Sequence, residues 1–287
     1  AFLLSLRYIP QDVHLKKDET FDVPGGVTFL VGLTAFLFIL NQGRNWHWAA
    51  LPVLSGLAIA AVFLIFFIWF EKRSSSPMLD LSLFTKPRFS ASIAAAVLNY
   101  ICVYSVIFLM PFFLINGRGL SPSQSGLVLS IQPVVMAVIA PISGTLSDRI
   151  GTRLPTSVGM FLLACGLVAL SMLGAATPFF LQALSLALCG LGIGVFISPN
   201  NSALMGSAPL RRQGIAAGMM ATARNVGMVL GVGLAGAVFT TVLGTDGLAD
   251  ASKIFIAVRS SFLAAAAFAL LGSAISFVPW SSTNEIS

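Results

Sequence analysis

Residues 154–210 read LPTSVGMFLLACGLVALSMLGAATPFFLQALSLALCGLGIGVFISPNNSALMGSAPL and contain no Asp, Glu, Lys, Arg or His in 57 positions. A helix needs roughly 20 mainly apolar residues to cross a hydrocarbon core about 30 Å thick. The stretch therefore predicts two membrane-spanning helices joined by a tight turn, which we place at Thr177 and Pro178.

The composition of the whole chain agrees with this stretch, since 57% of its 287 residues are hydrophobic and only 9% are charged. Such values lie outside the range of ordinary globular domains and exclude a soluble enzyme. A membrane β-barrel would show alternating polarity in segments of about 10 residues, whereas the apolar blocks here are much longer. Helices also satisfy the backbone hydrogen bonds in lipid, so the sequence predicts an all-α integral membrane protein.

Apolar blocks between charged residues predict eight membrane-spanning helices, of which the first is the shortest. They cover residues 23–40, 48–70, 89–115, 123–146, 154–173, 178–198, 215–243 and 260–280. Arg224 is the one charged residue inside these predicted spans.

Basic residues near helix ends collect on the cytoplasmic side of membrane proteins, and here they are unevenly divided. One set of loops holds four, namely Arg44, Arg118, Lys253 and Arg259. The other set holds eleven, namely Arg7, Lys16, Lys17, Lys72, Arg73, Lys86, Arg88, Arg149, Arg153, Arg211 and Arg212. With eight spans, this asymmetry predicts a multi-pass protein of the cell (plasma) membrane with both ends of the chain in the cytoplasm.

The net charge of +6 comes mostly from these loops, so it indicates contact with anionic headgroups rather than with nucleic acid. The three Cys lie in apolar blocks, and His14 and His47 are isolated. We therefore expect no disulfide framework, no metal site and no cofactor. Residues 1–22 are expected to hold the end of a preceding helix and a cytoplasmic connector, which would make the chain part of a longer membrane protein.

The clearest local pattern is the loop between two predicted spans, where residues 144–153 read GTLSDRIGTR. It resembles the cytoplasmic motif of the major facilitator superfamily, Gly-x-Leu-Ala-Asp-Arg-x-Gly-x-Arg, and departs from it mainly by Ser147 in place of Ala. A short motif is a hypothesis that needs its structural context, and the apolar spans on both sides of this loop supply it.

This resemblance implies gating roles for Gly144, Asp148, Arg149, Gly151 and Arg153. The glycines would let two helices turn and pack closely, the aspartate is expected at a helix N-terminus, and the arginines are expected to pair across a cytoplasmic interface. Contacts formed in one transport state and broken in the other would bias the equilibrium between the states. The alternative is an ordinary turn that carries cytoplasmic arginines.

Three further passages resemble the fourteen-span drug-proton antiporter group of that superfamily. They are PMLDLSLF at residues 77–84, GLSPSQSG at 119–126, and GIAAG at 214–218 followed by RNVG at 224–227. The resemblance implies that residues 23–88 hold a linker pair of transmembrane helices and a cytoplasmic loop. It also implies that residues 89–287 form the C-terminal six-helix bundle of the transporter, and that the N-terminal half is missing from this sequence.

The predicted span 215–243 carries both a charge and a packing pattern. A charge near the bilayer centre costs about 2.5 to 3.5 kcal/mol, so Arg224, followed by Asn225, is predicted to line the cavity or an interface between bundles. The alternative is that the span begins at Asn225 and that Arg224 is a helix-end arginine. The small residues Gly227 and Gly231, four apart, are predicted to let two helix backbones approach closely.

Uncharged polar residues in two other spans are candidates for a cavity lining, namely Asn99, Tyr100, Tyr104 and Gln132. The two tyrosines are four residues apart and so share one helix face. The alternative for each residue is an interhelical hydrogen bond, worth about 0.6 kcal/mol on average.

Proton-coupled transport requires a group inside the membrane that binds and releases a proton, usually Asp, Glu or His. None of the predicted spans contains one, so the proton-carrying residue is expected in the missing half.

The leading hypothesis is a secondary active transporter, not an enzyme, that exports small amphipathic compounds of the multidrug or antibiotic type in exchange for protons by alternating access. Its expected partners are a small-molecule substrate, protons, the lipid bilayer and the N-terminal half of the same protein. The alternatives are an integral-membrane enzyme, which would need a cluster of catalytic side chains, and a channel subunit, which would need charged rings or a filter loop.

Overall fold

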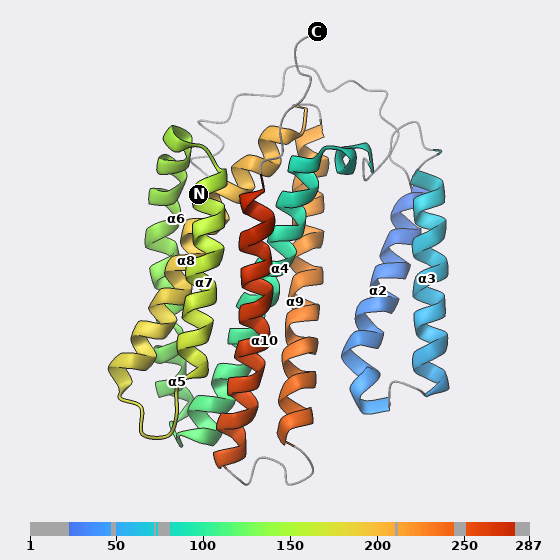
Figure 1. Cartoon of the computed structure of the whole chain (residues 1–287). Helices are drawn as coiled ribbons and strands as arrows, with labels where there is room; N and C mark the ends of the chain where they lie inside the picture. The colour runs from blue at the N-terminus through green and yellow to red at the C-terminus, as the bar shows by residue number, and fades with distance from the viewer. Residues whose placement is uncertain are drawn as a thin grey trace, which may run out of the picture.

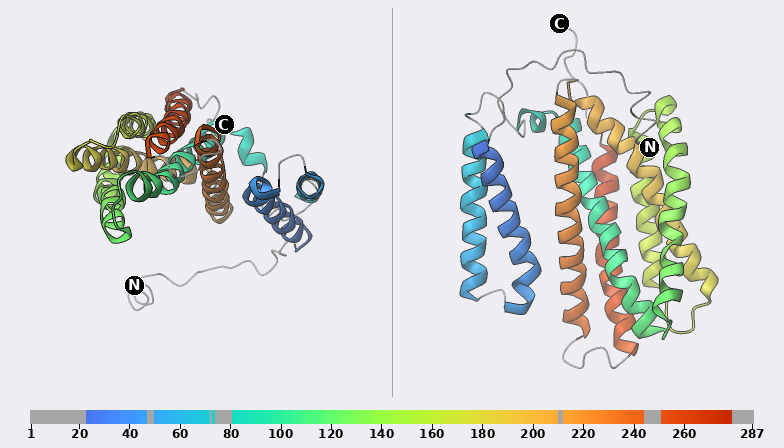
Figure 2. Two further views of the ribbon diagram at one scale, coloured as in Figure 1. Left: turned by 90° about the horizontal axis from the view of Figure 1, so that it is seen from below. Right: turned by 180° about the vertical axis from the view of Figure 1, so that it is seen from behind.

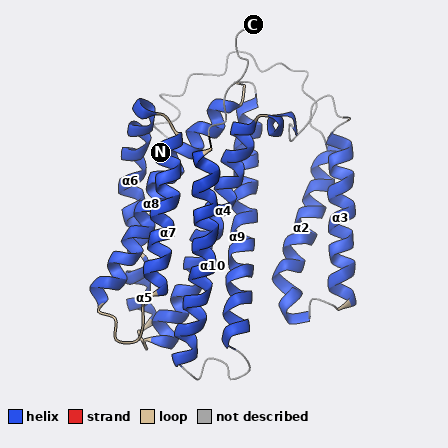
Figure 3. Ribbon diagram, viewed as in Figure 1, coloured by secondary structure: helices blue, strands red, loops and turns tan. Residues whose placement is uncertain are grey.

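The computed structural model describes residues 23–46, 50–71, 73, 81–209, 212–243 and 251–278. Within these ranges all regular structure is helical (Figure 3). Seven helices of this part of the chain are long and apolar enough to cross a membrane. The protein is therefore an all-α membrane protein, as its sequence predicts.

Two helices precede the main bundle. α2 (Val23–Trp46) and α3 (Leu51–Glu71) pack side by side, and α2 lies next to α9 (Figures 1 and 2). α3 has the length of a membrane span, whereas the apolar stretch of α2 covers only Pro24–Phe36. Seven of the eight predicted spans thus have membrane length. The exception is the predicted span 23–40, whose helix α2 has an apolar stretch too short to count as a membrane span. The predicted connector 1–22 lies outside the described residues.

The remaining helices form the main bundle. Their bounds are η1 (Leu81–Thr85), α4 (Pro87–Pro111), η2 (Phe112–Gly117), α5 (Pro122–Leu129), α6 (Ile131–Ile150), α7 (Arg153–Ser171), α8 (Phe179–Ser207), α9 (Gln213–Leu243) and α10 (Ala251–Phe277). α4 packs on α8, α9 and α10, while α7 packs between α8 and α10. α6 packs mainly on α8 at the side of the bundle (Figure 1).

Successive long helices run in opposite directions, so the start of α2 and the end of α10 lie at the same end of the molecule (Figure 1). We call this the motif end, because the turn between α6 and α7 lies there, and we call the opposite end the far end. A shared end for both ends of the described chain agrees with an even number of membrane crossings.

Buried apolar side chains from α4, α7, α8 and α10 form one continuous core. Leu109, Leu163, Leu186 and Phe262 are among its fully buried members. On the outer side of α6, by contrast, Val134, Val138 and Ile142 are exposed and lie four residues apart. Apolar residues at this spacing form one stripe along the helix, and a stripe exposed on a membrane helix suits contact with lipid.

The charge-free stretch 154–210 forms the predicted helical hairpin. α7 ends at Ser171 and α8 begins at Phe179, so the turn includes Thr177 and Pro178 as expected. The two backbones approach closely because glycine lies at the contact: a Cβ on Gly159 would stand 2.6 Å from the amide nitrogen of Phe196. Any larger residue there would push α7 and α8 apart.

The span predicted at 123–146 is present as one apolar segment of membrane length, Pro122–Ile150, but a turn at Ser130 divides it into α5 and α6. α5 begins with a capping box, in which Ser121 and Gln124 bond each other's backbone amides. Pro133 has no N–H to donate to the carbonyl of Leu129, which favours a break at this point. α6 then continues to Ile150, beyond the predicted end.

The last predicted span, 260–280, is also wrong at its start, since α10 begins at Ala251. Lys253 and Arg259 therefore lie inside a helix, and Arg224 is not the only basic residue within one. Long basic side chains near a helix end reach toward the membrane surface along their own stems, so a charge does not mark the helix boundary. The predicted end at Trp280 lies outside the described residues. α8 likewise continues past its predicted end at residue 198, to Ser207.

Candidate functional site

The loop 144–153 consists of the last turns of α6 and a tight turn into α7. Gly151 adopts φ +84°, a conformation that favours glycine because it has no Cβ. Gly144 lies against α8, where a Cβ would stand 2.7 Å from the Ser198 hydroxyl oxygen. One glycine thus makes the turn, and the other allows α6 to pack closely on α8.

Asp148 lies in the last turn of α6, so its expected position at a helix N-terminus is wrong. The C-terminal carbonyls of its own helix do not stabilise a carboxylate. Asp148 and Arg149 are both exposed at the motif end, and neither side chain has a bonding partner within the described part of the chain. Both charged groups are therefore available to another surface.

Arg153 connects α7 to α10 at the motif end. Its Nε donates a hydrogen bond to the Phe277 carbonyl at 2.6 Å, and its guanidinium lies 4.9 Å from the centre of the Phe277 ring. The carbonyl is one of those left without a partner at the end of α10. Arg153 thus joins two helices of the same bundle.

The two tyrosines and Arg224 come together where α4 meets α9. Tyr100 interacts electrostatically with both Arg224 and Tyr104. Arg224 is exposed, while Tyr100, Tyr104 and Asn225 are partly buried. We call Tyr100, Tyr104 and Arg224 the α4–α9 polar face.

Gly227 and Gly231 bring α9 against α4 beside this face. A Cβ on Gly227 would stand 2.6 Å from the Tyr100 Cβ, and one on Gly231 would stand 2.6 Å from the carbonyl oxygen of Ile101. The spacing of four residues keeps both glycines on the side of α9 that contacts α4. The short distance between the helices positions Arg224 next to Tyr100.

The other two polar candidates are buried between helices. Asn99 is 1% exposed, and its Nδ2 donates to the Met160 sulfur of α7 at 3.3 Å. Gln132 is also buried, at the contact of α6 with Gly190 of α8. Their geometry favours the alternative of interhelical packing over that of a cavity lining.

Sequence analysis missed several polar contacts that join helices. Arg88 at the start of α4 donates to the Thr152 hydroxyl at 3.3 Å. From the sequence, Arg88 was noted only as one of the basic residues in the predicted cytoplasmic loops. Ser157 of α7 and Ser273 of α10 bond each other. Serines inside apolar spans were the available signal, because small polar residues frequently hydrogen-bond between membrane helices.

Residues 21–232 match the family model of the Major Facilitator Superfamily. The chain is 30% identical over 274 residues to the riboflavin transporter RibZ of Clostridioides difficile (strain 630), covering 95% of this chain and 59% of that protein. It is 31% identical over 243 residues to the multidrug resistance protein Stp of Mycobacterium tuberculosis (strain ATCC 25618 / H37Rv). This alignment covers 85% of this chain and 45% of that protein.

A further relative is the tetracenomycin C resistance and export protein of Streptomyces glaucescens, 30% identical over 229 residues, with 80% of this chain and 43% of that protein covered. Among solved structures, a bacterial homologue of the human lysosomal transporter Spinster, in an inward-facing and occupied conformation, aligns with a TM-score of 0.56. That alignment covers 88% of this chain and 64% of the other at 16% identity, which shows a shared fold. The chain spans about half the length of the curated relatives that it matches.

Proposed function

Because this chain belongs to the Major Facilitator Superfamily, we propose that it forms part of a secondary active transporter that exports small amphipathic compounds in exchange for protons. Transport would proceed by alternating access, in which two helical bundles rock about a cavity between them. Residues 89–287 would be the C-terminal bundle, and a second bundle of the same protein would complete the cavity.

The observation that carries this proposal is the exposure of Arg224 on the α4–α9 polar face. α9 has 31 residues, which makes it about 46 Å long against a hydrocarbon core of about 30 Å. Arg224 lies eleven residues after the start of α9 at Gln213. If α9 is centred in the membrane, Arg224 lies about 8 Å inside the core.

At this depth a lipid-facing charge costs about 2.5 to 3.5 kcal/mol. The exposed Arg224 is therefore better explained by a face that meets water or protein than by one that meets lipid. The nearby Tyr100 and Tyr104 add hydroxyl groups to the same face. Polar groups on an otherwise apolar wall suit a cavity that binds amphipathic compounds.

The fourteen-span arrangement is part of the proposal. α2 and α3 pack on each other beside α9, outside the main bundle (Figure 2). This placement supports assigning residues 23–88 to a linker pair with its following loop. We place the motif end in the cytoplasm of a cell-membrane protein because the predicted cytoplasmic arginines Arg73, Arg88, Arg149 and Arg153 gather there.

Gating is proposed for Asp148 and Arg149. Both are exposed at the motif end without a partner in the described part of the chain, so each is free to pair with the second bundle. Such pairs would stabilise one of the two transport states and would break in the other. Gly144, Gly151 and Arg153 would hold the loop in position.

Riboflavin is a second candidate substrate, since the relative named as a riboflavin transporter matches 95% of this chain. Riboflavin has a flat aromatic ring system and a polar chain, so an apolar wall with a few polar groups suits it as well. The proton-carrying residue is proposed to lie outside this sequence, because Asp, Glu and His are absent from the middle of the described spans.

The test uses everted membrane vesicles from cells that express the intact protein. A fluorescent cationic dye and labelled riboflavin are offered separately, with and without an imposed proton gradient. We expect gradient-dependent uptake of one of them, abolished by an ionophore and absent from vesicles without the protein. Uptake that is independent of the gradient would refute proton coupling, and uptake of neither compound would refute the proposed substrate class.

A further inference from the structure

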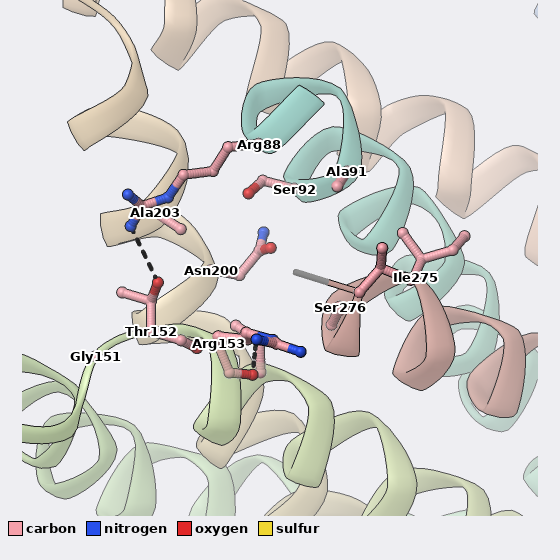
Figure 4. A pocket seen from close by; sticks show the side chains of 12 residues that line it. Arg88, Ala91, Ser92, Gly151, Thr152, Arg153, Asn200, Ala203, Ile275 and Ser276 are labelled. Carbon is pink, nitrogen blue, oxygen red and sulfur yellow. Dashed lines mark hydrogen bonds between the residues drawn. The ribbon is translucent and has the colours of Figure 1, made fainter. Parts of the chain in front are cut away.

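A pocket of about 340 Å³ lies at the motif end, where α4, α7, α8 and α10 meet (Figure 4). We call it the motif-end pocket. Its polar lining includes Arg88, Ser92, Thr152, Arg153, Thr156 and Asn200. No acidic side chain of the described residues lines it. The pocket therefore combines two positive charges with several hydrogen-bond donors.

Asn200 is the decisive group in this pocket. It lies on α8 with 2% of its surface exposed, and its side chain points into the space between Arg88, Ser92 and Arg153 (Figure 4). Its amide Nδ2 has no hydrogen-bond partner among the described residues. Buried polar groups nearly always have a partner, so an unpaired buried amide that faces a pocket indicates a ligand with an acceptor atom.

The two arginines have donors to spare. Arg88 donates one N–H to the Thr152 hydroxyl, and Arg153 uses its Nε for the Phe277 carbonyl. Each guanidinium carries five N–H groups. The Thr152 hydroxyl and the Phe277 carbonyl are both neutral, and neither arginine bonds a carboxylate within the described ranges. Their positive charges are not neutralised by this part of the protein.

Two helices also begin at the pocket. α4 starts at Pro87 and α7 at Arg153, and the N-cap residues Lys86 and Thr152 make no side-chain capping bond. Free amides and the helix dipole at a helix N-terminus favour negative charge. The N-termini of α4 and α7 therefore act together with the two guanidinium groups and the unpaired amide. All of these groups favour an anion in the pocket.

We propose that the motif-end pocket binds a phosphate group, supplied by the headgroup of an anionic lipid or by a soluble phosphate. Arg88 and Arg153 would bind its charged oxygens, and the Nδ2 of Asn200 would donate to a third oxygen. Planar guanidinium groups suit phosphate, because they can form two parallel hydrogen bonds with it. The pocket lies at the end of the membrane helices, where lipid headgroups lie. The proposal does not depend on which compound is transported.

Native mass spectrometry of the intact protein tests the proposal. The purified protein is incubated with phosphatidylglycerol or phosphatidylcholine, with and without inorganic phosphate, and the bound fraction is measured. We expect preferential binding of phosphatidylglycerol, weakened about tenfold by Arg88→Gln and by Asn200→Ala, since each removes a hydrogen bond to a charged group. Arg73→Gln is the matched control, because it removes one charge at the same end outside the pocket and should leave binding unchanged.

Competition distinguishes the two sources of phosphate. Displacement of the lipid by inorganic phosphate supports a soluble ligand, whereas retention of the lipid supports a headgroup. Thermal unfolding in phosphate-free detergent provides a second measurement: Asn200→Ala should keep the wild-type Tm there but lose the rise in Tm that anion addition produces. Equal binding of both lipids with no effect of phosphate on Tm would overturn the proposal, as would equal losses in Arg88→Gln and Arg73→Gln.

Discussion

Ser157 of α7 and Ser273 of α10 exchange hydrogen bonds across the helix interface, since each hydroxyl donates to the backbone carbonyl of the other residue at 2.9 Å. The two hydroxyl oxygens also lie 3.2 Å apart. Because both side chains are small, the helices can approach closely enough for both bonds to form. This pair joins α7 to α10 in the half of the bundle nearer the motif end.

Replacing Ser273 by Ala should destabilise this interface modestly. Hydrogen bonds between membrane helices contribute about 0.6 kcal/mol on average and rarely more than about 1.7 kcal/mol, so we expect a loss in that range in thermal or denaturant unfolding. Ser260→Ala is the control, because the Ser260 hydroxyl bonds only the Ile256 carbonyl of its own helix. Equal losses in the two variants would contradict a specific role for the pair.

Gly231→Ala should separate α9 from α4. Its added methyl group would meet the Ile101 carbonyl oxygen at 2.6 Å, and overpacking of this kind costs about 1 to 3 kcal/mol. Gly233→Ala adds the same methyl two residues later on α9, where no atom of a neighbouring helix lies within 4 Å. We expect a lower Tm for Gly231→Ala and an unchanged or slightly higher Tm for Gly233→Ala, because Ala favours helix.

Gly151→Ala should strain the turn between α6 and α7. Gly151 has φ +84° and ψ 164°, a region essentially restricted to glycine, and residues forced into such regions cost about 1 to 3 kcal/mol. Gly126→Ala is the comparison, since Gly126 lies in a regular helix with open space around it. Unfolding measurements that rank the two variants the other way would contradict this interpretation of the turn.

Arg118→Gln should loosen the far end of the bundle. Nη1 of Arg118 donates to the Thr177 carbonyl at 2.5 Å and to the Gly174 carbonyl at 3.4 Å, which attaches η2 to the turn between α7 and α8. A hydrogen bond from a charged group contributes about 1.5 to 3 kcal/mol. We expect faster proteolysis of this turn in Arg118→Gln. Arg259→Gln is the control, because Arg259 is exposed on α10 and its replacement should have little effect.

Arg224→Leu should abolish transport in the intact protein without preventing its folding. Leu is at least as compatible with the membrane as the charged Arg224, so the variant should still fold. The polar face, however, would lose its cation. Arg224→Lys keeps the charge and should keep part of the uptake measured in everted vesicles. Normal uptake by a well-expressed Arg224→Leu protein would remove Arg224 from the proposed cavity.

Several features of this protein could be predicted from sequence because they depend only on local composition. The charge-free stretch 154–210 predicted the α7–α8 hairpin, and the spacing of Gly227 and Gly231 identified the side of α9 that contacts α4. Helix ends were predicted less well. Lys253 and Arg259 did not end α10, because a long side chain can carry its charge away from the helix axis.

The candidate sites also include features that could be predicted from sequence and features that could not. The membrane helices and the turn that contains Gly151 follow from sequence alone, because the length of an apolar stretch and the residues of a turn act over a few neighbouring positions. Three features became visible only in the folded chain: Asn99 is buried against Met160, Asp148 lies in the last turn of α6, and Arg88, Arg153 and Asn200 share one pocket. Residues separated by 47 to 112 positions in the chain, such as these three, meet only through packing of the helices that carry them.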